Sequence, residues 1–422
     1  MQNRILTVAI LGVGARGGDA YGMLINEAKE KFDIVALCDL RQERLDVFGE
    51  QFGVKEENRF LSEDDFFAEK RADVLVIATP DPCHVRHAVR AFETGYDIMV
   101  EKPISDKREE IEQLLATQKK YGKKALVCHV LRYAPAFLKT AEMIDNGAIG
   151  RLVAINALER VGYWHQAHSY VRGNWRNDAF STPMILAKCC HDLDLIQYYA
   201  KSPCVSVSSV GDLTFFTEEN APEGAAKRCT ECKHIDSCPY SAKSIYLNLW
   251  KDRDYPENRW PFNVVTDAPV TEEKLMDAIK NGPYGRCAFY CDNNVVDHQI
   301  TQMSFQNGVK ATLTMTGFTA GGGRRMHFHG TLGELVLDEF RNKIYWHRFG
   351  ENEQEINLED LTENGYGHGG GDYFLVQNLY DMVLGNLPDR TSLTASAESH
   401  LIGICAEESR RAGGKLMMVH ND

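Results

Sequence analysis

The sequence predicts an α/β protein of two domains, the first built on a parallel sheet and the second on a large open mixed or antiparallel sheet. Three observations predict it. A glycine-rich turn follows the first apolar run, strands and helices then alternate up to about residue 125, and strands without regular crossover helices follow. A chain of 422 residues is also too long for one ordinary core. We expect the domains to span 1–128 and 129–422.

Short apolar runs alternate with helical stretches in the first domain. Strands are expected at Ile5–Leu11, Ile34–Cys38, Val74–Ala78, Ile98–Val100 and Ala125–Cys128, and helices between them at 17–31 and 109–121. This alternation predicts a parallel sheet with right-handed crossovers. Ligands of such sheets bind at the carboxyl ends of the strands. The residues that fall there are Asp39, Thr79, Pro80, Glu101 and Lys102.

The glycines at Gly12, Gly14 and Gly17 lie between the first strand and the first helix. In that position they are typical of a Rossmann turn, whose backbone N–H groups face the pyrophosphate of a dinucleotide. Asp39 ends the second strand at the spacing of a ribose-binding carboxylate. Because a carboxylate repels a 2′-phosphate, NAD is favoured. Arg41, two residues later, leaves NADP as the alternative.

In the second domain, strands no longer alternate regularly with helices. Strands are expected at 152–159, 204–213, 297–305, 309–318, 326–330, 333–338 and 343–349, with helices at 181–200, 372–384 and 393–412. Turn signals between several strands predict an antiparallel or mixed sheet. A large open sheet needs its outer face covered, so we expect a homodimer or homotetramer formed through that face.

Composition excludes several classes of protein. The net charge of −13, from 47 basic and 60 acidic residues, argues against nucleic acid as the main partner. No apolar stretch approaches the roughly 20 residues that span a bilayer, and no signal peptide is recognised, so a cytoplasmic protein is expected. In that compartment the 12 cysteines favour free thiols and a metal site over disulfides.

The order of these motifs resembles one family. The sequence resembles the Gfo/Idh/MocA family of nicotinamide-dependent sugar and polyol dehydrogenases. The motifs that occur in the same order are the glycine turn, Asp39, Ile77–Pro80 with His84, Glu101-Lys102-Pro103, Arg132 and His191–Asp194. The resemblance implies a carbohydrate substrate held between the open sheet and the nicotinamide. We expect cofactor contacts from Gly12, Gly14, Ala15, Arg16, Gly17, Asp39, Leu40, Arg41, Thr79, Pro80, His84, Glu101, Lys102 and Arg132.

Hydride transfer at a secondary alcohol needs a group that moves the hydroxyl proton and a cation that stabilises the alkoxide. Lys102 suits the second role, and Pro103 would fix the chain around it. His191 is the expected acid/base because imidazole titrates near neutral pH. The alternatives are a surface lysine and a structural histidine.

One position departs from the family pattern. The aspartate that relatives carry four residues before this histidine is replaced by Ala187. Lys188 is then expected either to lower the pKa of His191 by repulsion or to contact the sugar. The departure keeps open an NAD-dependent glycoside hydrolase or lyase that works by transient oxidation at C3 and elimination. The third hypothesis for the function is a nucleotide-binding protein without catalytic activity.

The segment 161–176 is dense in aromatic, histidine and arginine side chains, which suit sugar binding. We expect substrate contacts from Tyr163, His165, His168, Arg172, Trp175, Lys188, His191 and His368. The alternative for this segment is an ordinary loop packed on its own domain.

A cysteine-rich stretch at about 217–291 fits neither sheet and is expected to be an insertion. Cys229, Cys232, Cys238 and Cys287, with Cys291 as an alternative fourth ligand, predict a structural zinc site. Such a site would stabilise an insertion with little apolar core of its own. A disulfide or free thiols are the alternatives, and an iron–sulfur cluster is less favoured because the spacings match no common cluster motif.

Overall fold

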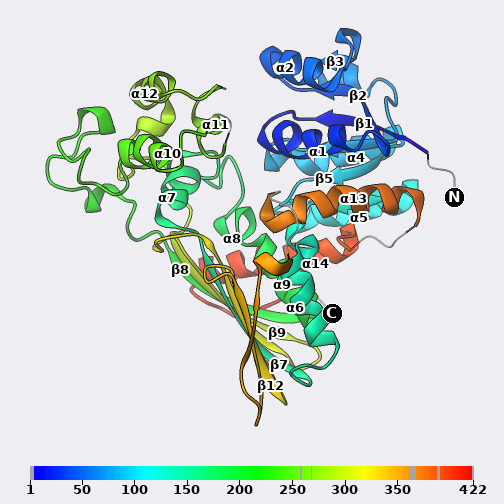
Figure 1. Ribbon diagram of the computed structural model, residues 1–422, viewed down its shortest axis with the longest axis vertical. Coiled ribbons are helices and arrows are strands. Elements are labelled where there is room, and N and C mark those ends of the chain that lie inside the picture. The colour runs from blue at the N-terminus through cyan, green and yellow to red at the C-terminus, as the bar shows by residue number, and fades with distance from the viewer. Residues whose placement is uncertain (1–3, 257–258, 268, 362–366, 387–389, 421–422) are drawn as a thin grey trace.

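A computed structural model describes residues 4–256, 259–267, 269–361, 367–386 and 390–420. It shows two β-sheets, one above the other, with a helical insertion beside the upper sheet (Figure 1). No helix in these ranges combines the length and apolarity needed to cross a membrane.

The N-terminal sheet confirms the predicted Rossmann fold. Its six strands are parallel and follow the order β3-β2-β1-β4-β5-β6. The strands span Leu6–Leu11 (β1), Phe32–Cys38 (β2), Arg59–Phe60 (β3), Val74–Ile77 (β4), Asp97–Val100 (β5) and Ala125–Val127 (β6). The helices around them are Ala15–Gly22 (η1), Met23–Glu27 (α1), Gln42–Phe52 (α2), Glu63–Phe67 (α3), His84–Thr94 (α4) and Arg108–Tyr121 (α5). Sequence reasoning missed β3, which has only two residues and no apolar run.

The C-terminal sheet is mixed, as predicted. Its order is β14-β13-β12-β11-β7-β10-β9-β8-β15, and only β7 and β10 pair in parallel. The strands span Leu152–Arg160 (β7), Cys204–Asp212 (β8), His298–Phe305 (β9), Lys310–Thr316 (β10), Gly323–Gly330 (β11), Gly333–Asp338 (β12), Lys343–Arg348 (β13), Gln354–Asn357 (β14) and Met417–Met418 (β15).

Side chains alternate between the two faces of this sheet. On β11, Met326 and Phe328 are buried, whereas Arg325 is exposed. The buried face is covered by Pro135–Asp145 (α6), Cys190–Ala200 (α9) and Leu393–Arg411 (α14). Val210 and Ile300 are apolar and at least 43% exposed on the other face.

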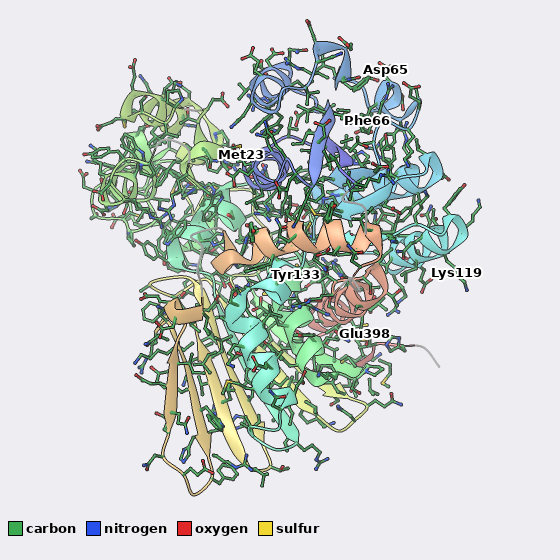
Figure 2. The ribbon with its side chains drawn as sticks, turned by 45° about the vertical axis from the view of Figure 1, so that its right-hand side comes forward. Met23, Asp65, Phe66, Lys119, Tyr133 and Glu398 are labelled. Atoms are coloured by element: carbon green, nitrogen blue, oxygen red, sulfur yellow. The ribbon has the colours of Figure 1, made fainter. Side chains whose placement is uncertain are left out.

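The end of the chain returns to the N-terminal domain. Helix α13 (Gly371–Leu384) lies between the two sheets in Figure 1 and contacts η1 and α1. Tyr133, labelled below α13 in Figure 2, donates a hydrogen bond to Asn378 Oδ1 at 2.9 Å. The Val127 N–H donates to the Thr391 carbonyl at 3.0 Å. Residues after 370 therefore pack against both sheets.

The insertion has a core of its own, so the expectation of little apolar core is wrong. Its helices include Leu249–Asp252 (α10), Phe262–Val265 (α11) and Glu272–Asn281 (α12). Trp250, Phe262 and Leu275 are buried together in it. The insertion also contacts the first domain, because Asn263 donates to Asp19 Oδ2 at 3.2 Å beside the glycine turn.

A buried ion pair joins the segment after the first domain to the helices under the open sheet. Arg132, on Val130–Tyr133 (η4), donates to both carboxylate oxygens of Asp194 on α9 at 2.7 Å. Both side chains are at most 5% exposed. Removing one partner leaves a buried charge without compensation.

We expect Arg132→Met to lower the free energy of unfolding by about 3–5 kcal/mol, because Asp194 stays buried without its partner. Urea denaturation at neutral pH measures the loss. Lys139→Met is the control, since its pair with Glu142 lies at the surface, with side chains 33% and 57% exposed, and is worth under about 1 kcal/mol. Equal losses in the two variants would contradict the assignment.

Candidate active site

The glycine turn leaves no room for side chains. Gly12 has φ +89°, and a Cβ there would lie 2.7 Å from the Ala78 carbonyl oxygen. A Cβ on Gly17 would lie 2.0 Å from the carbonyl oxygen of Gly12. The backbone therefore turns tightly into η1, whose first N–H groups have no partner within the helix. This cradle fits the diphosphate of a dinucleotide.

Asp39 is fixed at the end of β2 by backbone groups. Its Oδ2 accepts from the Val13 N–H and its Oδ1 from the Arg41 N–H, both at 2.9 Å. Arg44 Nη1 lies 3.6 Å from the same carboxylate and would be 3.3 Å from a Cβ on Gly14. Sequence reasoning missed Arg44, which faces this site because it lies on the first turn of α2.

The other residues expected near the adenine end lie at the surface. Leu40 is 80% exposed next to Asp39, and Ala15 and Pro80 are exposed at the same edge of the sheet. The Arg41 side chain points away from Asp39, to Glu43 at 3.7 Å and to Asp267 of the insertion at 3.5 Å.

Lys102 follows β5 and is held from two sides. The backbone N–H of Lys102 donates to Glu101 Oε2 at 3.0 Å, and its Nζ donates to the Ala187 carbonyl at 3.1 Å. Ala187 ends Met184–Ala187 (α8), where the predicted helix 181–200 breaks before α9. The carbonyls at a helix end lack intrahelical partners, which leaves this one available to the lysine.

A charged network behind Lys102 ties the two domains together. Glu101 Oε1 accepts from Arg16 Nε at 2.7 Å and from the Tyr21 hydroxyl at 2.8 Å. Arg16 also pairs with Asp372 of α13 at 2.7 Å. Burial opposes ionisation of Asp372, but Arg16 and His368 outweigh it and hold the pKa of this carboxyl well below its usual range.

His191 begins α9 beside Lys102 and is only 6% exposed. Burial, followed by the charges of Lys102 and Arg324, holds the pKa of His191 well below the usual value. Its imidazole is therefore neutral at neutral pH and able to accept a proton. Within the described part of the chain, its buried Nδ1 has no hydrogen-bond partner.

Lys188 has a buried partner, because its Nζ pairs with Glu159 at 3.1 Å. The cations that lower the pKa of His191 most are Lys102 and Arg324. Lys188 is the cation that lowers the pKa of His165 most, after burial. A contact between Lys188 and the sugar stays a prediction.

Four imidazole rings run from the surface into the interior. The ring of His191 lies 6.1 Å from that of His368 and 5.9 Å from that of His129, and His129 lies 5.5 Å from His400. His129 is fully buried, and neither of its ring nitrogens is hydrogen-bonded within the described residues. Sequence reasoning missed His129 and His400, since lone histidines in apolar stretches carry no spacing signal.

A second buried charged group lies under the site. Arg324 on β11 donates to Asp192 Oδ1 at 2.9 Å and lies 3.2 Å from Glu159 of β7. Burial and the nearby Glu159 hold the pKa of Asp192 above its usual range, although Arg324 opposes them. Arg324 was also missed, because an arginine on a strand signals burial only once its neighbours are known.

Two predicted cofactor residues position other groups instead. His84 is 1% exposed, with Nδ1 at 2.7 Å from the Pro103 carbonyl and Nε2 at 2.7 Å from the Thr79 carbonyl. Both ring nitrogens are thus occupied, and His84 joins the ends of β4 and β5. Arg132 is similarly taken up by Asp194. Neither side chain has a polar atom left for a cofactor, so these two assignments are corrected.

The segment 161–176, which was predicted to bind substrate, contains two short helices. It forms Tyr163–His165 (α7) and Gln166–Arg172 (η5), so its side chains point in different directions. His165 packs on Trp260 with ring centroids 4.8 Å apart. Trp175 donates to Asp81 at 3.0 Å. His165, Trp175 and Tyr163 are partly exposed and remain candidates for substrate contact.

His168 and Arg172 were wrongly expected to bind substrate. His168 is 2% exposed and stacks on Tyr284 of the insertion, with ring centroids 4.9 Å apart. Arg172 is 1% exposed and donates to the carbonyls of Arg286 and Tyr240. Both belong to the interior of the insertion, which no spacing in the segment revealed.

The cysteines of the insertion gather as a group. Cys229, Cys232, Cys238 and Cys287 line one cavity of about 20 Å³. Cys291 is not part of its lining and donates to the Cys287 carbonyl at 3.2 Å. All 12 cysteines of the chain lie in described segments, and none of them forms a disulfide. The metal itself stays a prediction.

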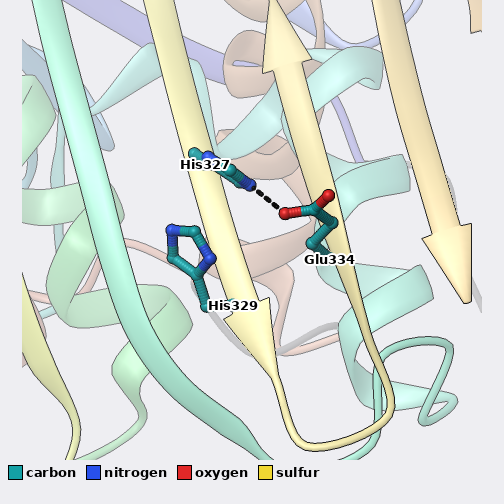
Figure 3. Close-up of side chains that lie close together, drawn as sticks. All are labelled: His327, His329 and Glu334. Atoms are coloured by element: carbon teal, nitrogen blue, oxygen red, sulfur yellow. Dashed lines mark hydrogen bonds and ion pairs between the residues drawn. The ribbon is translucent and has the colours of Figure 1, made fainter. Parts of the chain in front are cut away.

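A different cluster on the open sheet was not predicted. Figure 3 shows His327 and His329 on β11 next to Glu334 on β12. His327 Nε2 lies 2.8 Å from Glu334, and His329 Nε2 lies 2.9 Å from Asn156 Oδ1. All three are partly exposed and already have partners. They therefore add nothing to the site around Lys102.

Comparison with known proteins agrees with this geometry. Residues 6–129 match the model "Oxidoreductase family, NAD-binding Rossmann fold", and residues 141–418 match "Oxidoreductase family, C-terminal alpha/beta domain", the two Gfo/Idh/MocA models. The chain is 24% identical to "Putative oxidoreductase YteT" of Bacillus subtilis, over 95% of this chain and 94% of that protein.

Two further relatives name carbohydrates. D-glucoside 3-dehydrogenase of Escherichia coli is 26% identical over 38% of this chain and 46% of its own length. The solved structure of levoglucosan dehydrogenase with NADH and levoglucosan has a TM-score of 0.71 at 17% identity, and the match covers 99% of this chain and all of that one. The structural likeness shows a shared fold.

The histidine row generates a pH prediction. Burial lowers the pKa of His400 to about 3, and its Nε2 accepts from the Ile104 N–H at 2.9 Å. Between about pH 6.5 and 3 the unfolded chain binds a proton here that the folded chain does not. The contribution of neutral His400 to the free energy of unfolding is therefore full above about pH 6.5. It decreases as the pH is lowered toward 3, by up to about 1.4 kcal/mol per pH unit.

We expect His400→Gln to flatten the dependence of unfolding free energy on pH by about that slope between pH 6 and 4, because the amide has no proton to take up. Chemical denaturation at several pH values measures both curves. Parallel curves for the variant and the wild type would show that His400 is not buried in its neutral form.

Proposed function

Because the chain belongs to the Gfo/Idh/MocA family of NAD-binding oxidoreductases, we propose that it transfers hydride between NAD and a secondary hydroxyl or ketone of a sugar, glycoside or polyol. The observation that carries the proposal is the position of Lys102 at the carboxyl end of β5, beside a neutral, buried His191. The relative named as a glucoside dehydrogenase supports the substrate class.

The chemistry divides between two side chains of this protein. Bound NAD would supply the hydride acceptor. Lys102 places a positive charge where an alkoxide develops as the hydroxyl loses its proton. His191, held neutral by burial and by nearby cations, accepts that proton as a general base and returns it in the reverse direction.

Histidines surround this base, at the place where the family resemblance led us to expect a carboxylate. Ala187 offers only its carbonyl, which Lys102 already binds. The rings beside His191 are those of His368 and His129. His368 is exposed, and its Nδ1 lies 3.0 Å from Asp372 Oδ2, which suits a substrate contact or a route for the proton to solvent.

NAD rather than NADP is the proposed cofactor. The Asp39 carboxylate is fixed by two backbone N–H groups and faces the edge where a ribose would lie. A 2′-phosphate there would be repelled. Arg44 already lies near Asp39, and the Arg41 side chain pairs with acidic residues elsewhere.

The outer face of the open sheet supports assembly into a homodimer or homotetramer. Val210 and Ile300 are exposed there, on the face of the sheet opposite to the one that α6, α9 and α14 cover. A second copy of the sheet would bury these side chains.

We expect Gly12→Ala to abolish NAD binding, since its Cβ would meet the Ala78 carbonyl and displace the turn. Gly53→Ala is the matched control. Gly53 also has positive φ, at +72°, but has nothing within 4 Å of its added Cβ, so it costs only about 1 kcal/mol of strain. Calorimetry with NAD separates the two. Equal affinity of the two variants for NAD would show that the glycine turn is not part of the binding site.

We expect Lys102→Met to lower kcat/KM about 10²–10³-fold or more while NAD affinity stays within about threefold, because the lysine stabilises charge that develops during the reaction. NADH formation is followed with aldoses, methyl glucosides and inositols. Lys107→Met, an exposed lysine five residues on, should leave the rate unchanged. Full activity of Lys102→Met would contradict its role.

Assays with further compounds distinguish the alternative functions. Nitrophenyl glycosides cleaved without added NAD, with deuterium from solvent entering at C2, would identify the elimination route instead of net oxidation. NAD binding with no turnover on any compound would leave a nucleotide-binding protein without catalysis.

A further inference from the structure

The four cysteines around the insertion cavity come from two separate stretches. Cys229, Cys232 and Cys238 lie before α10, whereas Cys287 follows α12. The stretches are joined by an antiparallel bridge between Arg228 and Arg286, and the Cys287 N–H donates to the Lys227 carbonyl at 2.9 Å. The backbone thus brings the fourth cysteine to the other three.

A buried cation points at this cavity without a counter-charge. Arg172 lines it and is 1% exposed. Its Nη2 lies 3.7 Å from Cys229 Sγ, and its remaining acceptors are backbone carbonyls. Its hydrogen-bond partners in the described ranges are these carbonyls and this sulfur, with no carboxylate among them. A buried charge is stable only when it is compensated, so an anionic group is expected in the cavity.

Thiolates bound to a metal would supply that negative charge. The N–H of Ala242 also donates to Cys229 Sγ at 3.3 Å, as N–H groups do at metal-bound sulfur. Apolar side chains complete the lining, among them Ile235, Ala288 and Phe289. They would keep water from the bound group.

The spacing of the sulfur atoms distinguishes between metals. A single zinc ion, with Zn–S bonds of about 2.3 Å in a tetrahedron, holds its four sulfurs roughly 4 Å apart. Among the described residues, no three cysteine sulfurs lie within 4.8 Å of one another. The four cysteines therefore face one cavity but are too widely spaced for one ion. A cluster of four irons and four sulfides separates its ligands farther.

We propose that Cys229, Cys232, Cys238 and Cys287 bind a [4Fe–4S] cluster, and that Arg172 compensates its negative charge. The cluster links the two stretches on either side of α10–α12. Because the insertion contacts Asp19 and Arg41 beside the glycine turn, the cluster also fixes the segment that borders the cofactor site. This inference does not depend on the proposed hydride transfer.

The test uses the full chain, produced with added iron and purified without oxygen, and then treated with Fe²⁺ and sulfide. We expect about four irons and four acid-labile sulfides per chain, with visible absorption that dithionite bleaches. Cys229→Ser and Cys287→Ser should lose at least half of the iron. Cys291→Ser is the matched control and should keep it, since this neighbouring thiol does not line the cavity.

Arg172→Met tests the charge separately. If the variant holds its cluster, the midpoint potential should become more negative, because a nearby positive charge that favours the reduced form is gone. One zinc per chain with no iron, or no metal after reconstitution, would overturn the proposal. So would full iron content in both cysteine variants that line the cavity.

Discussion

The structure depends on charges buried where the two sheets meet. Glu101, Arg16 and Asp372 form one connected group in which each carboxylate is offset by the same guanidinium. The two carboxylates are at most 8% exposed, and neither would be stable as a charge there without the guanidinium. Because Glu101 precedes Lys102 and Asp372 begins α13, this group sets the lysine at the junction and fixes the C-terminal helix against the glycine turn.

Local patterns made the first half of the site predictable. The turn at Gly12 and Gly17 and the carboxylate of Asp39 depend on residues that are close in sequence, so spacing alone indicates their roles. Lys102 and His191 were identified through the family resemblance, and the structure brings them together through contacts with Ala187 and His129. The parallel sheet and the mixed sheet followed from alternation and turn signals.

Contacts between residues that are distant in sequence could not be predicted from these local patterns. Arg324, His129 and His400 acquire their roles only when β11, the segment after β6 and α14 meet, and no periodicity in their own stretches marks them. Arg172 shows the opposite error. Its neighbours suggested a sugar site, but η5 turns its guanidinium into the insertion, where the cysteines rather than the substrate explain its burial.

The central claim is that hydride passes between a carbinol carbon and NAD beside Lys102. Mass spectrometry of the nucleotide tests it most directly, after incubation with NAD and with glucose, methyl glucoside or inositol deuterated at the ring carbons. The account predicts that the recovered reduced nucleotide carries one deuterium with at least one of these compounds. Nucleotide that binds but returns oxidised and unlabelled from all of them would contradict it.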